Sequence, residues 1–343
     1  MRAVLYYSNS DVRVEERPVP EIGPGELLIQ VEVSGICGSD VMEWYRRSRA
    51  PLVLGHEIAG SIAAVGAKVQ GLKPGDRVTA AHHVPCNTCR HCLTGHHTMC
   101  HTLHTTNFDP GGFAEFLRLT PLHVDRGVFP LPASVSFDDA IFVEPLACIV
   151  RAQRMARMRA GATVLVLGSG IAGLLHVKLA RALGAGRILA TDISPYRLDA
   201  ARRVGADAAV GGGAEVAPWV RDANDGRLAD LVIVSTGARA ALGQALTSVE
   251  PGGTVLFFAP ATPEVTVPSL PFNNVFFRTD LTVTTSYGAS PADYAEALEL
   301  IRSRRVQVRD MITHRLGLSA AARGFTLVAE ARESIKVLLD HHQ

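Results

Sequence analysis

The segment VLVLGSGIAG, at residues 164–173, constrains the fold of this chain more than any other feature of its sequence. An apolar run leads directly into Gly168, Gly170 and Gly173 at the mouth of a helical segment. In such a pattern the first glycine permits a tight turn, the second lets phosphate approach the backbone, and the third lets the helix pack on the strand. The helix N-terminus then offers unpaired N–H groups to a pyrophosphate. The segment therefore predicts a strand–turn–helix unit that binds a dinucleotide.

Strands and helices alternate through the part of the chain that follows residue 147. Apolar periodicity predicts strands at 163–167, 188–191, 231–234, 253–259 and 281–285, and helices at 171–183, 195–204, 240–249 and 291–303. Alternation with short connections implies a parallel, doubly wound sheet of the α/β class. Because a glycine-rich turn alone often serves only packing, it is this setting that favours the nucleotide interpretation.

Asp192 ends the strand that follows the glycine-rich turn. A carboxylate there can accept hydrogen bonds from ribose hydroxyls and would repel a 2′-phosphate. The alternative is a surface-loop residue that caps the next helix, beside Ser194, which is itself a plausible N-cap. We expect the cofactor role, and NAD rather than NADP.

Short β-branched runs separated by Gly/Pro turns fill the first 147 residues. The turn sequences GPGE, KPGD and DPGG separate these runs, a texture typical of an irregular, mostly antiparallel β domain. A chain of 343 residues is too long for one ordinary core. We expect a β-rich domain formed by 1–147 and 287–343, with a nucleotide-binding domain, 148–286, inserted in it.

Four cysteines crowd into fifteen residues with the spacing C-x2-C-x2-C-x7-C: Cys86, Cys89, Cys92 and Cys100. Four thiolates on one short loop can close a tetrahedron around Zn²⁺ and leave no position open. Such a site stabilises a loop that lacks a core of its own. The alternatives are four reduced cysteines without metal, or a redox CxxC pair, which would require a different structural setting. We expect a structural zinc, with most of the neighbouring histidines solvated.

Three further motifs carry candidate metal ligands, and the first two contain glycines: GICGSD with Cys37, Ser39 and Asp40, GHEIAG with His56 and Glu57, and VEPLAC with Glu144. A catalytic zinc takes three protein ligands and keeps one position for water or substrate. Taken alone, a Cys is most often a core residue and a His is commonly inert. The two glutamates, however, lie in apolar runs where an unpaired carboxylate is unfavourable, and a metal would explain them.

Five motifs, GICGSD, LGHEIAG, the four-cysteine segment, EPL and GSGIAG, occur in the order found in the zinc-containing medium-chain dehydrogenase/reductase superfamily. The chain resembles this superfamily over essentially its whole length. It is most similar to the sorbitol and threonine dehydrogenase branch. The resemblance implies a GroES-like zinc-binding catalytic domain and a Rossmann NAD-binding domain. It also implies two zinc ions per chain, one catalytic and one structural.

The resemblance assigns roles to particular residues. Cys37 and His56 bind the catalytic zinc, Glu57 and Glu144 lie at it and bind directly or through water, Asp40 orients His56, and Ser39 passes the alcohol proton outward. The cofactor is bound by Gly168, Gly170, Ala172, Gly173, Asp192 and Arg197, the last at the adenosine ribose.

Two features separate the chain from close members of the branch. The sorbitol enzymes have Arg-Tyr where this chain has Ser286-Tyr287, and Tyr where it has Glu43, so polyol binding need not follow their pattern. His83 matches a pocket histidine of the threonine branch. A threonine-dehydrogenase-like enzyme is therefore an alternative.

The predicted function is a zinc-dependent oxidoreductase that transfers a hydride between a secondary alcohol (polyol, sugar, cyclitol or amino alcohol) and NAD. From other classes, the alternatives are a zinc-ribbon nucleic-acid-binding protein, a catalytically silent NAD sensor and a zinc-free reductase of the same superfamily. The net charge of +1 and the absence of a basic stripe argue against nucleic acid. The intact ligand set argues against a silent sensor.

We expect a small-molecule alcohol as substrate, with neither nucleic acid nor a membrane as a partner. The opening residues lack a signal-type apolar core, and no stretch approaches the length of a membrane span. A cytoplasmic protein is the expectation. The resemblance further suggests a homotetramer, with a dimer as the next choice.

Overall fold

The computed structural model describes residues 1–266 and 272–343. The chain forms two compact units: Met1–Ala147 together with Gly288–Gln343, called here the β-rich unit, and Cys148–Tyr287, the parallel-sheet unit. The chain returns to the β-rich unit after Tyr287, whereas the sequence placed that return after Ser286. Helix α6 (Val143–Met155) contains the first crossing.

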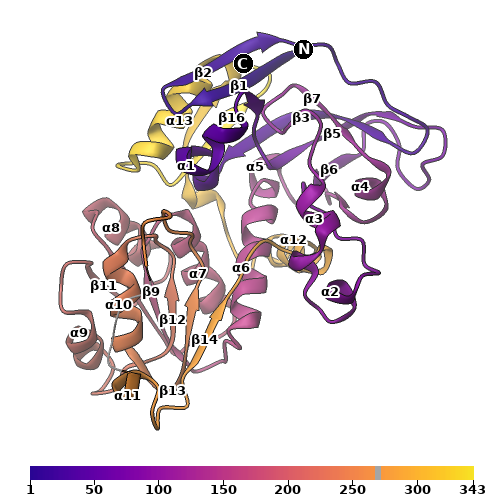
Figure 1. Ribbon diagram of the computed structural model, residues 1–343. Helices are drawn as coiled ribbons and strands as arrows, with labels where there is room; N and C mark the ends of the chain where they lie inside the picture. Colours follow the sequence, from indigo (N-terminus) through magenta and orange to yellow (C-terminus); the bar gives the residue numbers. More distant parts are fainter. Residues whose placement is uncertain (267–271) are drawn as a thin grey trace. The chain divides into compact units, whose positions relative to one another are not determined.

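Six parallel strands form the sheet of the parallel-sheet unit, in the order β11-β10-β9-β12-β13-β14 (Figure 1). Their bounds are β9 (Thr163–Leu167), β10 (Arg187–Asp192), β11 (Ala208–Gly211), β12 (Ala229–Val234), β13 (Val249–Phe257) and β14 (Thr282–Thr285). Numbered along the chain this is the order 3-2-1-4-5-6 of the Rossmann fold, with the strand order reversing between β9 and β12. The predicted doubly wound parallel sheet is confirmed.

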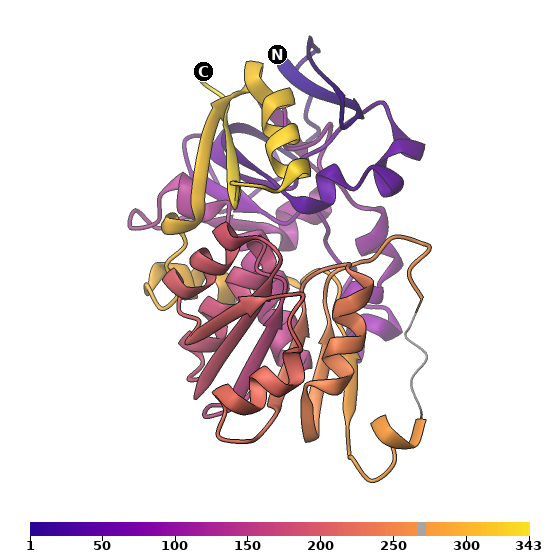
Figure 2. The same cartoon turned by 90° about the vertical axis from the view of Figure 1, so that its left-hand side faces the viewer.

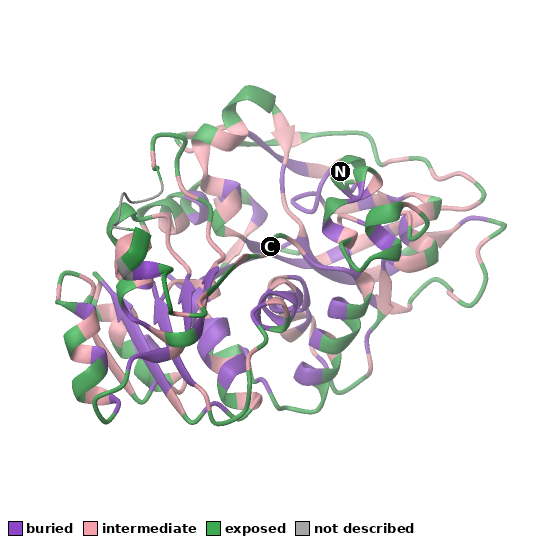
Figure 3. Cartoon of the chain, turned by 60° about the horizontal axis from the view of Figure 1, so that its bottom comes forward, coloured by how far each residue is buried: buried purple, intermediate pink, exposed green. Residues whose placement is uncertain are grey.

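Helices cover both faces of this sheet. They are α7 (Ile171–Ala182), α8 (Pro195–Arg203), α9 (Val216–Ala223) and α10 (Arg239–Thr247), and the short α11 (Phe272–Val275) comes before β14 in the chain. Apolar side chains of α9 and α10 pack in one cluster with Leu165 and Val232 of the strands. Gly173 of α7 lies against Val166, which points to the opposite face because side chains alternate along a strand. Every residue of β9 is buried, as the purple strands of Figure 3 illustrate.

Antiparallel strands dominate the β-rich unit. One sheet has the order β2-β1-β4 and a second has the order β15-β16-β3-β5-β6-β8, with β7 paired to β3. The strands are β1 (Arg2–Ser8), β2 (Asp11–Glu16), β3 (Leu27–Ile36), β4 (Leu52–Val53), β5 (Glu57–Val65), β6 (Arg77–Ala80), β7 (Phe116–Leu119), β8 (Val128–Pro130), β15 (Ile312–Gly317) and β16 (Lys336–Asp340).

Short helices connect these strands. They are η1 (Gly38–Val41), α1 (Glu43–Arg46), η2 (Arg47–Arg49), α2 (Arg90–Leu93), η3 (His97–Met99), α3 (His101–Thr105), α4 (Pro121–Arg126), α5 (Phe137–Ala140), α12 (Pro291–Arg302), η4 (Arg309–Met311), η5 (Leu318–Ala320) and α13 (Ala321–Glu330). Within 1–266 and 272–343, no helix has the length and apolar character needed to cross a membrane.

Residues from both ends of the sequence share one core in the β-rich unit. Figure 2 shows α13, in yellow, beside the indigo N-terminal strands. The ring of Phe325 in α13 lies 5.7 Å from the rings of both Tyr6 and Phe113. Strand β16 pairs antiparallel with β3, placing Val337 opposite Ile36. The C-terminal return is therefore an integral part of the sheet that carries the first predicted ligand motif.

Candidate metal and nucleotide sites

The GICGSD motif forms a tight turn directly after β3. Cys37 is the N-cap of η1, and its Sγ accepts a hydrogen bond from the Ser39 N–H at 3.5 Å. In return, Oδ2 of Asp40 accepts from the Cys37 N–H at 3.0 Å. This reciprocal arrangement is a capping box with a cysteine in the usual serine position. It fixes the thiol, the hydroxyl and the carboxylate in one turn.

His56 and Glu57 arrive at this turn from the neighbouring strand. Strand β5 begins at Glu57 and pairs antiparallel with β3, opposite Gly35. As a result, Cys37 Sγ, a ring nitrogen of His56 and a carboxylate oxygen of Glu57 all lie within 4.8 Å of one another. One thiolate, one imidazole and one carboxylate are ligand types that zinc takes in catalytic sites.

The electrostatics of this group favour a cation. Asp40 is completely buried, with Oδ1 3.4 Å from Nδ1 of His56. Burial alone would raise the pKa of Asp40, but His56, Arg46 and the Cys37 N–H outweigh it and lower that pKa. Burial alone would lower the pKa of His56, but Asp40 and Cys37 raise it well above the ordinary value. The site therefore stabilises a positive charge, and its residues fit a zinc ion.

Arg46, which the sequence did not single out, holds Ser39. Its Nε donates to the Ser39 carbonyl at 2.9 Å, and its Nη2 donates to Ser39 Oγ at 3.3 Å. Because a guanidinium only donates, the hydroxyl proton of Ser39 remains available for another acceptor. The basic stretch RRSR, at residues 46–49, was the only signal for this residue in the sequence.

Lys336 is the second residue that sequence reasoning missed. It is fully buried and its Nζ forms an ion pair with Glu57, which is also buried. The chain therefore supplies a cation of its own beside Glu57, so burial of this carboxylate does not by itself require a metal. A lysine within the apolar segment IKVLLD, at 335–340, was the available signal.

Two other predicted residues lie outside the three-ligand group. Glu144 is buried in the first turn of α6, and its carboxylate is not among the atoms within 4.8 Å of one another. The Nδ1–H of His83 donates to the Thr106 carbonyl at 2.5 Å. Burial lowers the pKa of His83 to about 4. The His82 ring contacts the rings of His83 and His56, with centroid distances of 3.9 and 4.9 Å. Most of the histidines near the cysteines are exposed, as expected: His91, His96, His101 and His104.

The four remaining candidate ligands form a separate cluster. Neighbouring sulfurs lie 3.6–4.0 Å apart, and all four are within 4.8 Å of one another: Cys86, Cys89, Cys92 and Cys100. The apolar core around them contains one further buried side chain, Leu103. A lobe with so little apolar burial requires another source of stability, which a thiolate-bound zinc would supply.

The glycine-rich turn has the backbone geometry that its motif predicts. Gly168 has φ +93°, and a Cβ there would lie 2.9 Å from Thr236. A Cβ at Gly173 would lie 1.9 Å from the Gly168 carbonyl oxygen, so only glycine allows this close approach. Gly170 is the N-cap of α7, and Ala172 lies in its first turn. The N-terminus of α7 thus meets the carboxyl end of β9.

The side chain of Asp192 hydrogen-bonds two turns at the carboxyl ends of the strands. Its Oδ2 accepts from the Ser169 N–H at 2.7 Å, and its Oδ1 accepts from the Ser194 N–H at 2.9 Å. It is buried rather than a surface residue. Its bond to the Ser194 N–H is made to the N-cap residue of α8 and not to an N–H of the first turn, so it is not a cap of that helix. The guanidinium of Arg197 lies 3.8 Å from a Cβ built at Gly170, and its Nε has no hydrogen-bond partner among the described residues.

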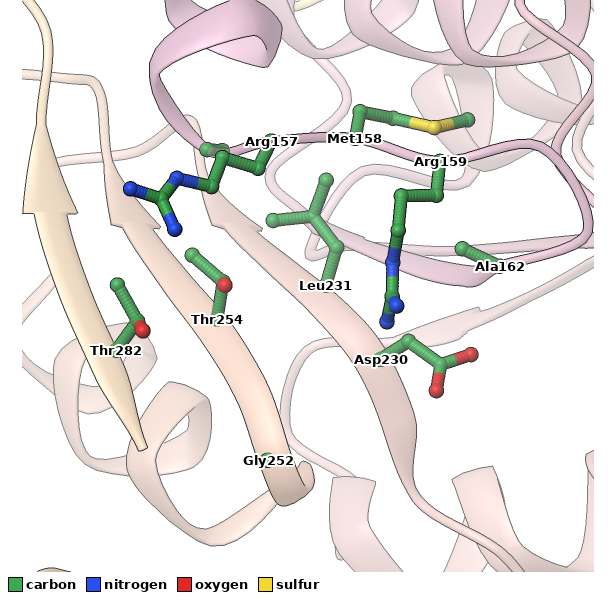
Figure 4. A pocket seen from close by; sticks show the side chains of 10 residues that line it. Arg157, Met158, Arg159, Ala162, Asp230, Leu231, Gly252, Thr254 and Thr282 are labelled. Carbon is green, nitrogen blue, oxygen red and sulfur yellow. The ribbon is translucent and has the colours of Figure 1, made fainter. Parts of the chain in front are cut away.

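A cavity of about 230 Å³ opens near the amino ends of the strands of this sheet (Figure 4). Arg157, Arg159 and Asp230 contribute to its lining, with Thr282 at the start of β14. These positions lie near the amino ends of the strands, whereas Gly168 follows the carboxyl end of β9. The cavity is therefore distinct from the predicted nucleotide site.

Together, the Rossmann sheet and the two clusters of zinc-type ligands define a zinc-binding, nucleotide-dependent oxidoreductase. Residues 23–133 match the alcohol dehydrogenase GroES-like domain, and residues 172–303 match the zinc-binding dehydrogenase model. The chain belongs to the zinc-containing medium-chain dehydrogenase/reductase family, in the branch that includes sorbitol dehydrogenase. This confirms the resemblance read from the motifs, and with it the GroES-like and Rossmann folds.

Individual relatives match over nearly their whole length. Sorbitol dehydrogenase of Gallus gallus is 32% identical over 349 residues, covering 98% of this chain and 95% of that protein. Sorbitol dehydrogenase of Bacillus subtilis is 31% identical over 331 residues, covering 93% and 90%. A solved Sinorhizobium meliloti 1021 protein bound to NADP is 28% identical with a TM-score of 0.87, covering 99% and 98%. The predicted class, a zinc-dependent alcohol or polyol dehydrogenase, is confirmed.

Proposed function

We propose that this enzyme oxidises a secondary alcohol of a polyol, sugar, cyclitol or amino alcohol to the ketone, with NAD as hydride acceptor. The observation that carries this proposal is the convergence of Cys37, His56 and Glu57 within 4.8 Å of one another, beside the hydroxyl of Ser39. The likeness to sorbitol dehydrogenases supports a polyol-type substrate.

Cys37, His56 and Glu57 would hold the catalytic zinc, with Glu144 as an exchangeable neighbour, and the four-cysteine lobe would hold a structural one. When bound, the catalytic zinc lowers the pKa of an alcohol hydroxyl, and NAD supplies the hydride acceptor. The residues of the chain position the ligands and move the proton. Asp40, fixed by the Cys37 N–H, holds the His56 ring in place.

Ser39 is the proposed first stop for the proton that leaves the alcohol. Arg46 binds both its carbonyl and its Oγ, so the hydroxyl is held in one orientation and can receive one proton while releasing its own. A positioned hydroxyl can serve as such a relay, and positioned proton transfer contributes roughly 10²–10⁴-fold to rate.

Asp192, Arg197 and the turn from Gly168 to Gly173 would bind the dinucleotide. The buried carboxylate of Asp192 beside Ser169 places negative charge at the end of β10, where it disfavours a 2′-phosphate. Arg197, beside Gly170, offers the adenosine side of the cofactor a positive charge.

Asp192→Ala is expected to relax the preference for NAD over NADP. The substitution removes the negative charge that opposes a 2′-phosphate and an acceptor for the ribose hydroxyls, so the affinity ratio should fall by roughly tenfold or more, about 1.4 kcal/mol. Titration of cofactor binding by NADH and NADPH fluorescence measures the ratio directly. A native enzyme that already prefers NADP would overturn the assignment of Asp192.

The substrate can be identified by a panel of polyols, cyclitols, sugars and amino alcohols, assayed by NADH absorbance with both NAD and NADP. Ser286 and Glu43 replace residues typical of sorbitol enzymes, so we expect a substrate other than the simplest hexitols. Selective oxidation of a 2-amino-3-hydroxy acid would favour the threonine-dehydrogenase-like alternative, for which His83 is the supporting residue. Oxidation of no member of the panel would overturn the proposal.

We also propose that the chain assembles as a homotetramer, with a dimer as the next choice. Strand β14 lies at an edge of the parallel sheet, and exposed apolar side chains gather on and before it: Phe272, Phe276, Phe277 and Val283. Such an edge requires cover in solution. Sedimentation equilibrium tests this proposal, and a monomer at micromolar concentration would overturn it.

A further inference from the structure

We propose that the cavity beside the C-terminus of α6 is a binding site for a small phosphate monoester, whose phosphate group Arg157 binds. The cavity has a volume of about 230 Å³ and is lined by residues of the parallel-sheet unit. Cavities for drug-sized ligands measure roughly 300–1,000 Å³, so this one suits a smaller molecule. The inference goes beyond the proposed function, because it concerns neither the metal ligands nor the glycine-rich turn.

Arg157 occupies a backbone position that favours glycine. Helix α6 ends in two hydrogen bonds of 3.0 Å, from the N–H groups of Arg157 and Met158 to carbonyls of its last turn. In this arrangement, the Schellman motif, the residue after the cap adopts a left-handed conformation and is usually glycine. Arg157 adopts it with φ +53°, although a Cβ makes this conformation unfavourable. A side chain kept at such a position is a candidate for a functional role.

The charges that line the cavity favour an anion. Arg157 and Arg159 belong to the lining, and across the part of the chain that the structure describes neither guanidinium forms a hydrogen bond or an ion pair. Asp230 is the acidic residue of the described lining, and its Oδ2 already accepts from the Thr163 N–H at 2.7 Å. Exposed arginines are common on protein surfaces, but these two share a cavity with a single opposing charge. The lining therefore attracts a negatively charged ligand.

One face of the parallel sheet supplies hydroxyl groups to the cavity. Thr254 and Thr282 lie opposite each other in register on β13 and β14, so their side chains point to the same face. In Figure 4 the Arg157 guanidinium lies on the side of these two hydroxyls, whereas the Arg159 guanidinium lies on the side of the Asp230 carboxylate. One end of the cavity therefore offers a cation and hydroxyls, and the other also offers an anionic acceptor.

This arrangement favours a phosphate monoester that carries free hydroxyl groups. The Arg157 guanidinium and two hydroxyls can donate to different terminal oxygens of one phosphate, and such charge-assisted bonds are strong. The Asp230 carboxylate can accept from a hydroxyl of the ligand, but it repels a second phosphate. A bisphosphate and an uncharged alcohol are therefore both poorer ligands for this cavity.

The test measures the binding of glycerol 2-phosphate by isothermal titration calorimetry, with NADH at saturation so that the glycine-rich turn is occupied. Arg157→Gly and Arg157→Gln both remove the guanidinium, and each should weaken binding roughly tenfold or more. Arg221→Gln is the matched control and should bind like the parent, because Arg221 is exposed on α9, outside the lining. Glycerol, which lacks the phosphate, should bind the parent and Arg157→Gln equally weakly.

Melting temperatures separate a role in binding from a role in the turn. Arg157→Gly relieves the left-handed strain, so without ligand it should melt at the parent's temperature or higher, and Arg157→Gln should melt close to the parent. Lower melting temperatures in both variants, with unchanged affinity, would show that the side chain serves the fold and would overturn the proposal. Equal affinity in all four proteins, or no binding by the parent at millimolar concentration, would overturn it as well.

A contact with a second copy of the chain is the rival explanation for two unpaired arginines. Sedimentation equilibrium of the parent and Arg157→Gln tests it. The same assembly in both, with weaker phosphate binding by the variant, supports the binding site. Dissociation of the variant, with no phosphate binding by the parent, overturns it. Because binding is measured without turnover, a parent that oxidises no alcohol would overturn the proposed function and leave this result unaffected.

Discussion

Mild chelation of the purified enzyme is expected to lower its zinc content from about two ions per chain to one, and to abolish activity while the fold persists. The two clusters differ in the number of ligands that they offer a metal. Cys37, His56 and Glu57 supply three, whereas the four-cysteine lobe supplies four. A site with an open position gives a chelator a point of attack, and a site closed by thiolates does not. Losing the Lewis acid forfeits several kcal/mol of transition-state stabilisation, roughly a thousand-fold in rate.

Matched cysteine substitutions separate the two sites. Cys37→Ser should lose one zinc ion and the activity with little change in melting temperature. Cys92→Ser, which removes a buried thiol of the lobe, should lose the other zinc ion and lower the melting temperature. Elemental analysis of each variant gives the count. Active parent protein that contains one zinc ion or none would contradict the two-site assignment.

The same chelation assay decides the role of Glu144. Glu144→Gln keeps size and removes charge, so a residue that neighbours the zinc should release it about ten- to a hundred-fold faster when changed, with turnover reduced in step. Glu144 lies in the first turn of α6 and outside the three-ligand group. A purely structural role therefore predicts the reverse. Normal zinc retention with a lower melting temperature would remove it from the site.

On acidification, the parallel-sheet unit is expected to unfold at a higher pH than protonation of its carboxylates alone would cause. His176 is the sole histidine between residues 148 and 287; it is fully buried, and burial lowers its pKa to about 3. Between pH 6.5 and about 3 the unfolded chain binds this proton and the folded chain does not, so the free energy of unfolding falls as the pH falls. The loss from this one group is roughly 3 kcal/mol by pH 4.

The matched variant is His176→Leu, which removes the titrating ring and keeps an apolar side chain beside Phe258. Trp219 packs against the core of this unit, and the chain has two tryptophans, so Trp44→Phe in both proteins leaves Trp219 as the fluorescent reporter. Urea unfolding followed from pH 7 to pH 4 should be steeper in pH for the parent than for His176→Leu. Parallel pH profiles would contradict the assignment.

Features that depend on neighbours in sequence could be predicted well. The turn at Gly168, for example, follows from a strand, three glycines and a helix within ten residues. Strand β11 and helix α9 were missed: AAVG lacks a β-branched run, and Pro218 interrupts the helical pattern of α9. Strand β13 begins four residues before its predicted start, because a register shift opposite it accommodates Pro251 and Gly252.

Residues that act across strands could not be predicted. Lys336 and Glu57 are 279 residues apart and meet only because β16 and β5 flank β3. Arg46 was not singled out in the sequence, and its side chain donates to both the carbonyl and the Oγ of Ser39. No local pattern encodes either contact, since each depends on the strand order of the finished sheet.

The late position of β16 sets an order of events during synthesis. All the candidate metal ligands have been made by residue 144, yet Lys336–Asp340, which pairs with β3 beside them, emerges only after the whole parallel-sheet unit. A nascent chain therefore presents cysteines and histidines while β3 still has an unpaired edge next to Cys37. The parallel-sheet unit can fold first, and the sheet of the β-rich unit is completed only when β16 has been made, so that the counter-charge of Lys336 and the final strand reach the metal ligands in a single step.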